Sequence, residues 1–297
     1  MISHITWRGI VAAFTLALSL GLAHAEPDEA RKKEIMAAFE AAQAAAVAGP
    51  SDIKLAGQAV LKLPAGMAYV PQPAAGRLMQ ALGNGADSSL LGLVRGTGDN
   101  HWLVVARYEP SGYIKDDDAK DWNVDDLFKS LKDGTEAGNK ERQKMGFPPL
   151  EIVGWVQKPS YDAAAHRLVW SMAARTPGES EADQSINYNT YALGREGYVS
   201  LNLISSRGDI EHDKPAAHAL LSALNFNDGK RYSDFNASTD KMAEYGIAAL
   251  VAGVAAKKLG LFAVILAFAA KFFKIILVAG AGLLAVVGKF FKRKEEA

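Results

Sequence analysis

Two neighbouring stretches decide the fold: LEIVGWVQKPSYDAAAHRLVWSMA at residues 150–173 and INYNTYALGREGYVSLNLI at residues 186–204. Each stretch holds two runs rich in β-branched and aromatic residues, which favour strands. The first pair of runs covers 150–156 and 167–173 and flanks the turn-forming residues 158–162. The second pair covers 186–193 and 198–204 and flanks 194–197. The pattern predicts two β-hairpins, and therefore antiparallel pairing.

Shorter patterns extend the sheet and add helices around the hairpins. Further strand signals cover residues 67–70, 90–94 and 102–108. The alternation from Ile53 to Leu63 predicts one more strand. Helical spacing covers residues 73–82, 123–131 and 216–224. Antiparallel strand pairs with helices before, between and after them predict an α+β fold. Its sheet would be mainly antiparallel with flanking helices, rather than doubly wound and parallel.

The composition is that of a folded protein and excludes several kinds of site. Hydrophobic residues make up 49% and charged residues 22% of the 297 residues, which excludes a disordered chain. Lys plus Arg and Asp plus Glu both number 33, and this zero net charge argues against a dedicated nucleic-acid-binding protein. Because the chain contains no cysteine, disulfides, thiol nucleophiles, cysteine-ligated metals and a lipoprotein anchor are excluded.

The N-terminal segment has the pattern of a secretory signal. Residues 1–25 combine Arg8, an uncharged run over 10–22 and the small-residue cleavage pattern Ala23-His24-Ala25. An uncleaved anchor helix is the alternative, but the apolar run is shorter than the ~20 residues that a membrane span needs. Residues 26–50 then predict an Ala-rich amphipathic helix.

The C-terminal segment has the pattern of a membrane anchor. Residues 272–291 predict a transmembrane helix, with Lys274 and Lys289 near its ends, where long side chains reach the interface. The basic tail 292–297 would lie in the cytoplasm by the positive-inside rule. Residues 246–271 predict a hydrophobic juxtamembrane helix. A second span stays open there, although Lys257 and Lys258 at its middle disfavour it. A soluble Ala-rich helical hairpin is the other alternative.

Together these signals predict a topology. Residues 51–230 would form a periplasmic α+β domain, and residues 231–245 a linker to the anchor in the bacterial inner membrane. One crossing joins a periplasmic N-terminus to a cytoplasmic tail, whereas two crossings would not.

Few residues suggest chemistry, and no catalytic residue, cofactor or nucleic-acid site is predicted. The acidic residues Asp116, Asp117, Asp118 and Asp121 are candidates for a weak cation site. Their spacing fails the EF-hand pattern, and a solvated loop explains them as well. The histidines show no metalloprotease spacing, and the glycine pairs lack the phosphate-loop pattern. The tryptophans and tyrosines predict a core, or alternatively a binding face.

Several motifs together carry a family resemblance. They are GYIKDDDA at 112–119, NKERQKMG at 139–146, VGW at 153–155 with PSYD at 159–162, LGREG at 193–197, and AEYG at 243–246 leading to AAKK at 255–258. Over residues 52–290 the chain resembles a bacterial family of uncharacterised membrane-anchored proteins, domain of unknown function 2167. The resemblance implies an envelope protein with a C-terminal anchor, and it carries over no activity and no catalytic residues.

Three functional hypotheses follow from the sequence. The first is a non-enzymatic membrane-anchored protein whose periplasmic domain binds another envelope protein and serves interaction or assembly. The second is a small-ligand or cation sensor that uses the 116–126 region. The third is an envelope-polymer hydrolase that uses carboxylates such as Asp117 or Glu151, which would need a cleft with two carboxyl groups at catalytic separation.

Overall fold

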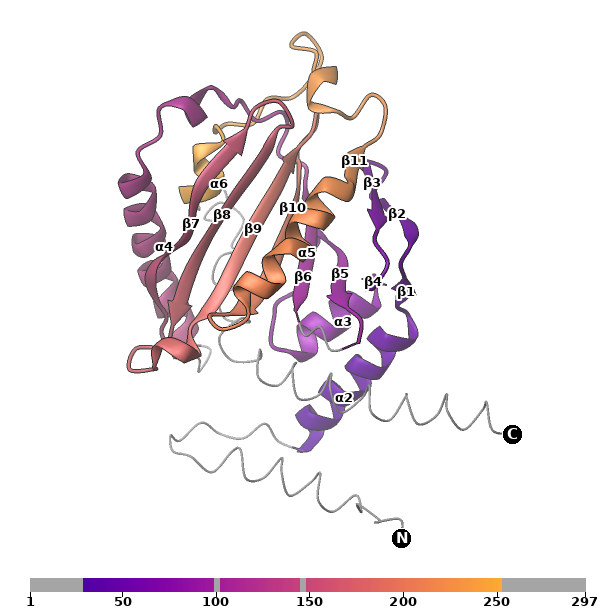
Figure 1. The fold of residues 1–297 in the computed structure, drawn as a ribbon, viewed down its shortest axis with the longest axis vertical. Coiled ribbons are helices and arrows are strands. Elements are labelled where there is room, and N and C mark those ends of the chain that lie inside the picture. The colour runs from indigo at the N-terminus through magenta and orange to yellow at the C-terminus, as the bar shows by residue number, and fades with distance from the viewer. Residues whose placement is uncertain (1–28, 99–101, 145–147, 253–297) are drawn as a thin grey trace, which may run out of the picture.

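The two predicted hairpins form the centre and one edge of an eight-stranded sheet (Figure 1). This computed structural model describes residues 29–98, 102–144 and 148–252. The strand order is β1-β4-β5-β6-β10-β9-β8-β7, and every neighbouring pair is antiparallel. The strands are β1 (Val47–Ala48), β4 (Met67–Pro71), β5 (Leu90–Gly96), β6 (Leu103–Glu109), β7 (Glu151–Asp162), β8 (Arg167–Arg175), β9 (Ser185–Leu193) and β10 (Tyr198–Ser206). The predicted α+β class with a mainly antiparallel sheet is confirmed.

The first hairpin turns later than predicted. Residues 158–162, expected as the turn, lie inside β7, which runs to Asp162. The chain reverses at residues 163–166, where the Asp162 carboxylate accepts two backbone hydrogen bonds. Pro159 is tolerated within β7 because this strand is at the edge of the sheet and its pairing with β8 shifts register there.

A second, three-stranded sheet corrects another prediction. It has the order β11-β3-β2, with β2 (Ser51–Leu55), β3 (Ala59–Leu63) and β11 (Leu224–Phe226). The expected single strand from Ile53 to Leu63 is therefore a hairpin. It turns at Ala56 and Gly57, which have φ of 50° and 70°. Leu55 pairs with Ala59 across this turn, so the apolar alternation continues through it and hides it from a pattern of period two.

One face of the large sheet packs on helix α5 (Ile210–Ala223) and on the three-stranded sheet. The core there includes Val104, Leu201 and Leu203 of the large sheet, Leu220 of α5 and Leu61 of β3, all of which are buried. Alternate residues of β6 and β10 supply these apolar side chains, as the period of a strand requires. Consequently the neighbouring residues of the same strands point to the opposite face.

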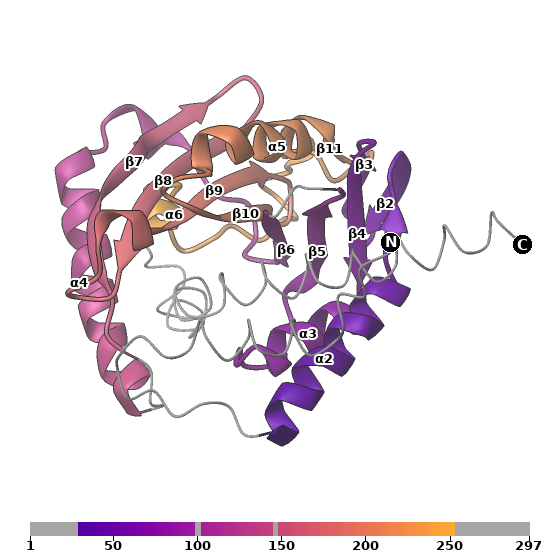
Figure 2. The ribbon, with the colours of Figure 1, turned by 60° about the horizontal axis from the view of Figure 1, so that its bottom comes forward.

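The opposite face, called here the α3 face, is covered by helices at its two ends. Helices α2 (Glu29–Ala44) and α3 (Ala74–Ala81) pack near β4 and β5. Helices α4 (Val124–Lys144) and α6 (Ala248–Ala252) pack near β7 and β8. Figure 2 shows α2 and α3 at one end of the sheet and α4 at the other. The α3 face therefore carries two separate apolar clusters with a strip of sheet between them.

Helix α4 is longer than predicted. Asn123, where the predicted helix begins, caps α4, because its side-chain oxygen accepts hydrogen bonds from the backbone N–H groups of Asp125 and Asp126 at 2.9 and 3.2 Å. The helix then continues through residues 132–144, beyond the predicted end at residue 131. Asn139 holds this extension, because its amide donates to the carbonyl of Leu150 and accepts from the N–H of Leu150, both at 2.8 Å.

Replacing Asn139 by alanine should lower the free energy of unfolding by about 2–4 kcal/mol, because each buried backbone group left without a partner costs ~1–3 kcal/mol. Urea denaturation of the full chain measures this change. Asn123→Ala is the matched control, since it removes an exposed cap worth about 1 kcal/mol. Equal losses in the two variants would show that the buried Asn139 hydrogen bonds stabilise the fold no more than an exposed helix cap does.

Residues 231–247, called here the strap, run back over the domain. The predicted linker 231–245 falls within it. Tyr113 and the strap exchange backbone hydrogen bonds, because Tyr113 donates to Lys241 at 2.9 Å and accepts from Ala243 at 2.8 Å. The Arg195 side chain forms two hydrogen bonds to the Asp240 carboxylate at 2.6 and 2.8 Å. Several of the family motifs, GYIKDDDA, LGREG and AEYG, therefore meet at the strap.

The described residues contain no helix that is both long and apolar enough to cross a membrane. The predicted transmembrane helix 272–291, the tail 292–297 and the signal 1–25 lie outside the described residues. The same is true of most of the predicted juxtamembrane helix 246–271, from which only α6 is described.

Candidate functional site

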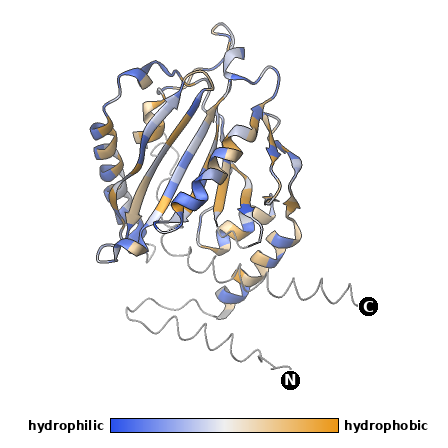
Figure 3. Cartoon of the chain, viewed as in Figure 1, coloured by the Kyte–Doolittle hydropathy of each residue, from blue (hydrophilic) through white to orange (hydrophobic). Residues whose placement is uncertain are grey.

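A row of polar side chains crosses the α3 face between its two apolar clusters. The register places Arg107 of β6 opposite Ser200 of β10, and Ser200 opposite Tyr191 of β9. Two residues further along, Asn202 pairs with Asn189. Directly opposite residues share one face of a sheet. Arg107, Asn189 and Asn202 are buried. Figure 3 shows hydrophilic residues interrupting these central strands.

The asparagines of this row form a partly satisfied network. Asn202 donates its side-chain N–H to the Asn189 side-chain oxygen at 2.6 Å, and Asn189 donates to the backbone carbonyl of Asn187 at 3.2 Å. Within the described residues, the Asn202 side-chain oxygen and the whole Asn187 side-chain amide are buried without a hydrogen-bond partner. Unsatisfied buried polar groups are rare in native proteins and call for water or a ligand.

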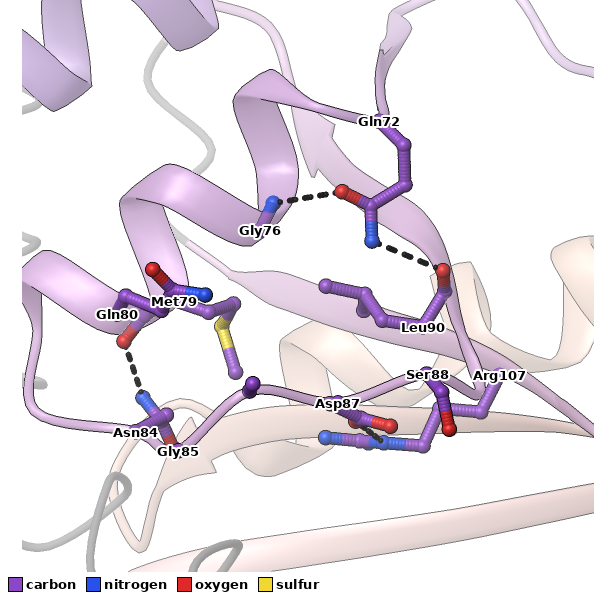
Figure 4. Close-up of a pocket in the computed structure, with 11 residues that line it drawn as sticks. Gln72, Gly76, Met79, Gln80, Asn84, Gly85, Asp87, Ser88, Leu90 and Arg107 are labelled. Carbon is purple, nitrogen blue, oxygen red and sulfur yellow. Dashed lines mark hydrogen bonds and ion pairs between the residues drawn. The ribbon is translucent and has the colours of Figure 1, made fainter.

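A cavity of about 260 Å³ opens beside this row, between α3, the loop after it and the strands β5 and β6 (Figure 4). Its lining includes Gln72, Asn84, Asp87, Ser88, Leu90 and Arg107. Arg107 thus belongs both to the polar row and to the cavity wall. The volume lies just below the ~300–1,000 Å³ of typical ligand pockets, so only a small molecule would fit.

An ion pair between Asp87 and Arg107 forms the charged part of the cavity wall. The Arg107 Nε donates to Asp87 Oδ2 at 2.7 Å, and the two side chains are only 5% and 16% exposed. Ser89 holds the other Asp87 oxygen, because its backbone N–H and its hydroxyl donate to Oδ1 at 3.0 and 2.7 Å. Figure 4 shows the Arg107 side chain running past Asp87 with the pair marked between them.

The Asp87 and Glu109 carboxyls near Arg107 have opposite pKa shifts. Burial acts to raise the pKa of Asp87, but the charge of Arg107 and the hydrogen bonds from Ser89 and Arg107 outweigh it, and the pKa is lowered. Burial raises the pKa of Glu109, and the hydrogen bond from Ser89 and the charge of Arg107 offset this only in part. One Glu109 oxygen is buried without a partner in the described residues. Asp87 is therefore the carboxylate that neutralises Arg107.

Replacing Glu109 by glutamine should stabilise the protein at neutral pH. Because the folded state holds the Glu109 proton more tightly than the unfolded state, stability falls as pH rises above the ordinary glutamate pKa of about 4.3. The variant lacks this titration, so its advantage should be present at pH 7 and disappear below pH ~4. Chemical denaturation at both pH values measures it, with the exposed Glu40→Gln as control. A stability difference that does not change with pH would refute the assignment.

Comparison with known proteins places the chain in a family. The sequence model of the family described as protein of unknown function (DUF2167) matches residues 47–292. The chain belongs to the DUF2167 family. A search of the curated proteins found no match. Among solved structures, the solution structure of cyanobacterial PsbP (CyanoP) from Synechocystis sp. PCC 6803 is a distant match. It has a TM-score of 0.36 and 10% identity over 61% of this chain and 91% of that one.

The acidic residues predicted as a cation site are placed apart in this DUF2167 protein. Asp116 accepts a hydrogen bond from the Tyr161 hydroxyl at 2.7 Å. Asp118 accepts from the backbone N–H groups of Ile247 and Ala248, both at 3.1 Å, and so caps α6. Asp117 and Asp121 are exposed at the two ends of the short helix η1 (Asp117–Lys120). In the described ranges, no three His, Asp or Glu side chains come together in a way that could hold a metal ion.

The other residues considered from the sequence also lie away from the cavity. Glu151, a candidate for hydrolysis, pairs with Arg175 across β7 and β8. His166 stacks on Tyr232 with ring centroids 4.0 Å apart and lies 3.2 Å from the Tyr161 hydroxyl. Tyr232 belongs to the strap, and its hydroxyl donates to the carbonyl of Ile114 at 2.8 Å. The contacts of Tyr232 with His166 and Ile114 therefore hold the strap on the domain.

The aromatic side chains pack into the core. Trp102, Trp170, Tyr188, Tyr198 and Tyr232 are buried. Trp122, Trp155, Tyr113, Tyr161 and Tyr191 are partly buried against the same cluster as α4. None of the large hydrophobic side chains found exposed in the described residues is aromatic. The alternative of an aromatic binding face has no support in this arrangement.

Sequence reasoning missed Arg107 and the polar row. The signal was present in the alternation of β9 and β10, where Asn187, Asn189, Ser200 and Asn202 occupy every second position. Such alternation is typical of strands with one face in water. These asparagines are buried instead. Ligand pockets carry a small number of such placed polar groups, so buried asparagines on a strand are a signal worth following.

Proposed function

We propose that this protein is a membrane-anchored protein of the bacterial envelope that acts by binding, and that its α+β domain holds a small polar molecule in the cavity beside Arg107. The cavity with the buried Asp87–Arg107 pair in its wall is the observation that carries the proposal. Burying an ion pair costs several kcal/mol of desolvation for each ion, and an apolar replacement is often at least as stable. A binding role gives a reason to keep the pair.

Unsatisfied buried polar atoms on the cavity wall and on the central strands support the same role. Asn84, Asn187, Asn202 and Glu109 each have a buried side-chain atom that finds no partner within the described residues. Such atoms cost about 1–3 kcal/mol each when nothing pairs with them. Asn84 lines the cavity, so a ligand or its bound water that donated to its oxygen would recover part of that cost.

A partner protein in the envelope stays part of the proposal. With the aromatic residues packed inside, support for it comes from the strap and the predicted anchor, which would hold the binding domain close to the membrane. Crosslinking of the full chain in cells, with and without the ligand, tests whether binding changes what the domain contacts. A partner captured equally with and without the ligand would show that the protein contact does not depend on ligand binding.

The proposed topology rests on the sequence patterns at 1–25 and 272–291. Alkaline phosphatase fused after residue 240 should be active, because the domain would be exported. Fused after residue 297 it should be inactive, because the basic tail would stay in the cytoplasm. Activity in both fusions would contradict the single crossing.

Thermal unfolding of the full chain in detergent, against a library of amino acids, sugars, organic acids and nucleobases, tests binding. A compound that binds the native state must raise Tm. Ser88→Trp, which adds an indole at the cavity wall, should abolish the rise. Ser130→Trp, at a residue of α4 that does not line the cavity, should leave it unchanged. A library without any hit, or hits that persist in Ser88→Trp, would refute the proposed site.

A further inference from the structure

The hydrogen-bonding groups around the cavity suggest which chemical class it takes. Asn84 is 9% exposed, and its side-chain N–H donates to the carbonyl of Met79 at 2.9 Å. This bond fixes the orientation of the amide, so the other atom is an oxygen acceptor. That oxygen is buried and accepts no hydrogen bond from the described residues. Asn84 therefore offers one acceptor to a donor group of a ligand.

Asp87 and Arg107 offer a second acceptor and a set of donors. The Arg107 guanidinium has five N–H groups. Within the described residues it hydrogen-bonds through Nε alone, to Asp87. Its two terminal nitrogens are consequently available to a carboxylate. The Asp87 carboxylate accepts three hydrogen bonds, two from Ser89 and one from Arg107. Since a carboxylate has about four acceptor sites, about one is left for a ligand.

On the cavity wall, the Gln72 side chain already makes hydrogen bonds within the protein. The Gln72 side-chain N–H donates to the carbonyl of Leu90 at 3.0 Å, and its oxygen accepts from the N–H of Gly76 at 3.2 Å.

The charges of the cavity wall also restrict the net charge of a ligand. Because Asp87 and Arg107 neutralise each other, a ligand with one net charge would leave a partly buried charge uncompensated, which is costly. A ligand with both charges and no net charge avoids this cost.

We infer that the ligand of this cavity is a small zwitterion, which presents an ammonium group to Asp87 and Asn84 and a carboxylate to the terminal nitrogens of Arg107. The inference rests on the proposed function and narrows it. The size of the cavity restricts the molecule to one with a short side chain.

Three related probes, which differ by the loss of one charged group, separate the contributions. Alanine carries both charges, ethylamine is alanine without its carboxylate, and propionate is alanine without its ammonium group. Full-length protein in detergent is titrated calorimetrically with each, and with glycine and β-alanine as further zwitterions. At least one zwitterion should bind with a Kd about tenfold or more below those of ethylamine and propionate, since each missing charge-assisted bond is worth ~1.4 kcal/mol or more.

Two variants test the assignment of the groups. Asn84→Ala removes the buried acceptor and should weaken zwitterion binding by about tenfold. Asp87→Asn leaves the charge of Arg107 unmatched, so propionate should then bind more tightly than alanine. The exposed Asp133→Asn on α4 should change neither affinity. If Asp87→Asn does not fold, the wild-type comparison and Asn84→Ala still decide the matter.

The outcomes distinguish this inference from the proposed function. Zwitterions that bind wild type and weaken in Asn84→Ala support both. Two results would overturn the zwitterion assignment and leave the binding function standing. One is that ethylamine or propionate binds as tightly as alanine. The other is that compounds of another class bind and lose their binding in Ser88→Trp. Zwitterions that fail, together with a library without hits, would overturn both.

Discussion

Replacing Asp87 by alanine is expected to lower the free energy of unfolding by about 3–5 kcal/mol, the range for breaking a buried ion pair from one side. The Arg107 side chain, 5% exposed, would lose its hydrogen-bond acceptor at 2.7 Å and keep its charge. Removing both charges in Asp87→Ala/Arg107→Met should recover much of this loss, because no unpaired charge is then buried. Urea denaturation at neutral pH measures all three proteins.

Asp133→Ala is the matched control for this prediction. It breaks the Lys129–Asp133 pair of α4, where the distance is 2.9 Å but the side chains are 76% and 63% exposed. Exposed pairs of this kind contribute about 0–1 kcal/mol. A loss in Asp87→Ala as small as that in Asp133→Ala would show that the cavity pair is well solvated, and the case for a buried charged site would fail.

The same pair predicts a pH dependence. Since the folded pKa of Asp87 is lowered, its contribution to stability is complete above the ordinary aspartate pKa of about 3.9 and is lost as pH falls through the folded value. The stability difference between wild type and Asp87→Ala should therefore shrink in acid. A difference that grows as pH falls would contradict the sign of this shift.

Replacing Gly112 by alanine is expected to cost about 2–5 kcal/mol, because two penalties combine. Gly112 has φ of 90°, which L side chains rarely adopt. An added Cβ would also lie 2.6 Å from the backbone oxygen of Lys241 in the strap. To relieve this clash the strap must move away from Tyr113, which it pairs with.

Gly57→Ala separates the two penalties. Gly57 also has a positive φ, of 70°, but nothing lies within 4 Å of a Cβ built there. This control should cost only the backbone term of about 1–2 kcal/mol. Hydrogen exchange adds a local readout, because the amides of Tyr113 and Ala243 should lose protection in Gly112→Ala alone. Equal stability and equal protection in the two variants would show that the strap is not held at Gly112.

The sequence allowed much of the sheet to be predicted, because its strands are rich in β-branched and aromatic residues and end at turn residues. It misled where a local pattern survived a change of structure. Leu55 and Ala59 keep their alternation across a turn, so one strand was expected where the chain folds into two. The polar run after Leu131, which contains Gly134 and Gly138, gave no helical pattern. Helix α4 continues through it because Asn139 forms two hydrogen bonds with the backbone of Leu150, a tertiary contact that the local sequence does not reveal.

The candidate site was less accessible to sequence reasoning. Its two charged residues lie on separate segments, Asp87 in the loop after α3 and Arg107 within β6. Only the packing of α3 against β5 brings the loop over the strand and forms the cavity. The acidic run that begins at Asp116 suggested a cation site because its aspartates lie close together in the sequence. In the structure, Asp116 instead accepts a hydrogen bond from Tyr161, and Asp118 accepts from the start of α6.

The most direct test of the central claim is equilibrium dialysis of the full chain against the protein-free, low-molecular-weight fraction of bacterial cells, read by mass spectrometry. Parallel chambers hold wild type, Ser88→Trp and Ser130→Trp. The predicted result is a small molecule that is enriched in the wild-type and Ser130→Trp chambers and is not enriched in the Ser88→Trp chamber. An equal distribution of all compounds across the three chambers would contradict a binding site beside Arg107.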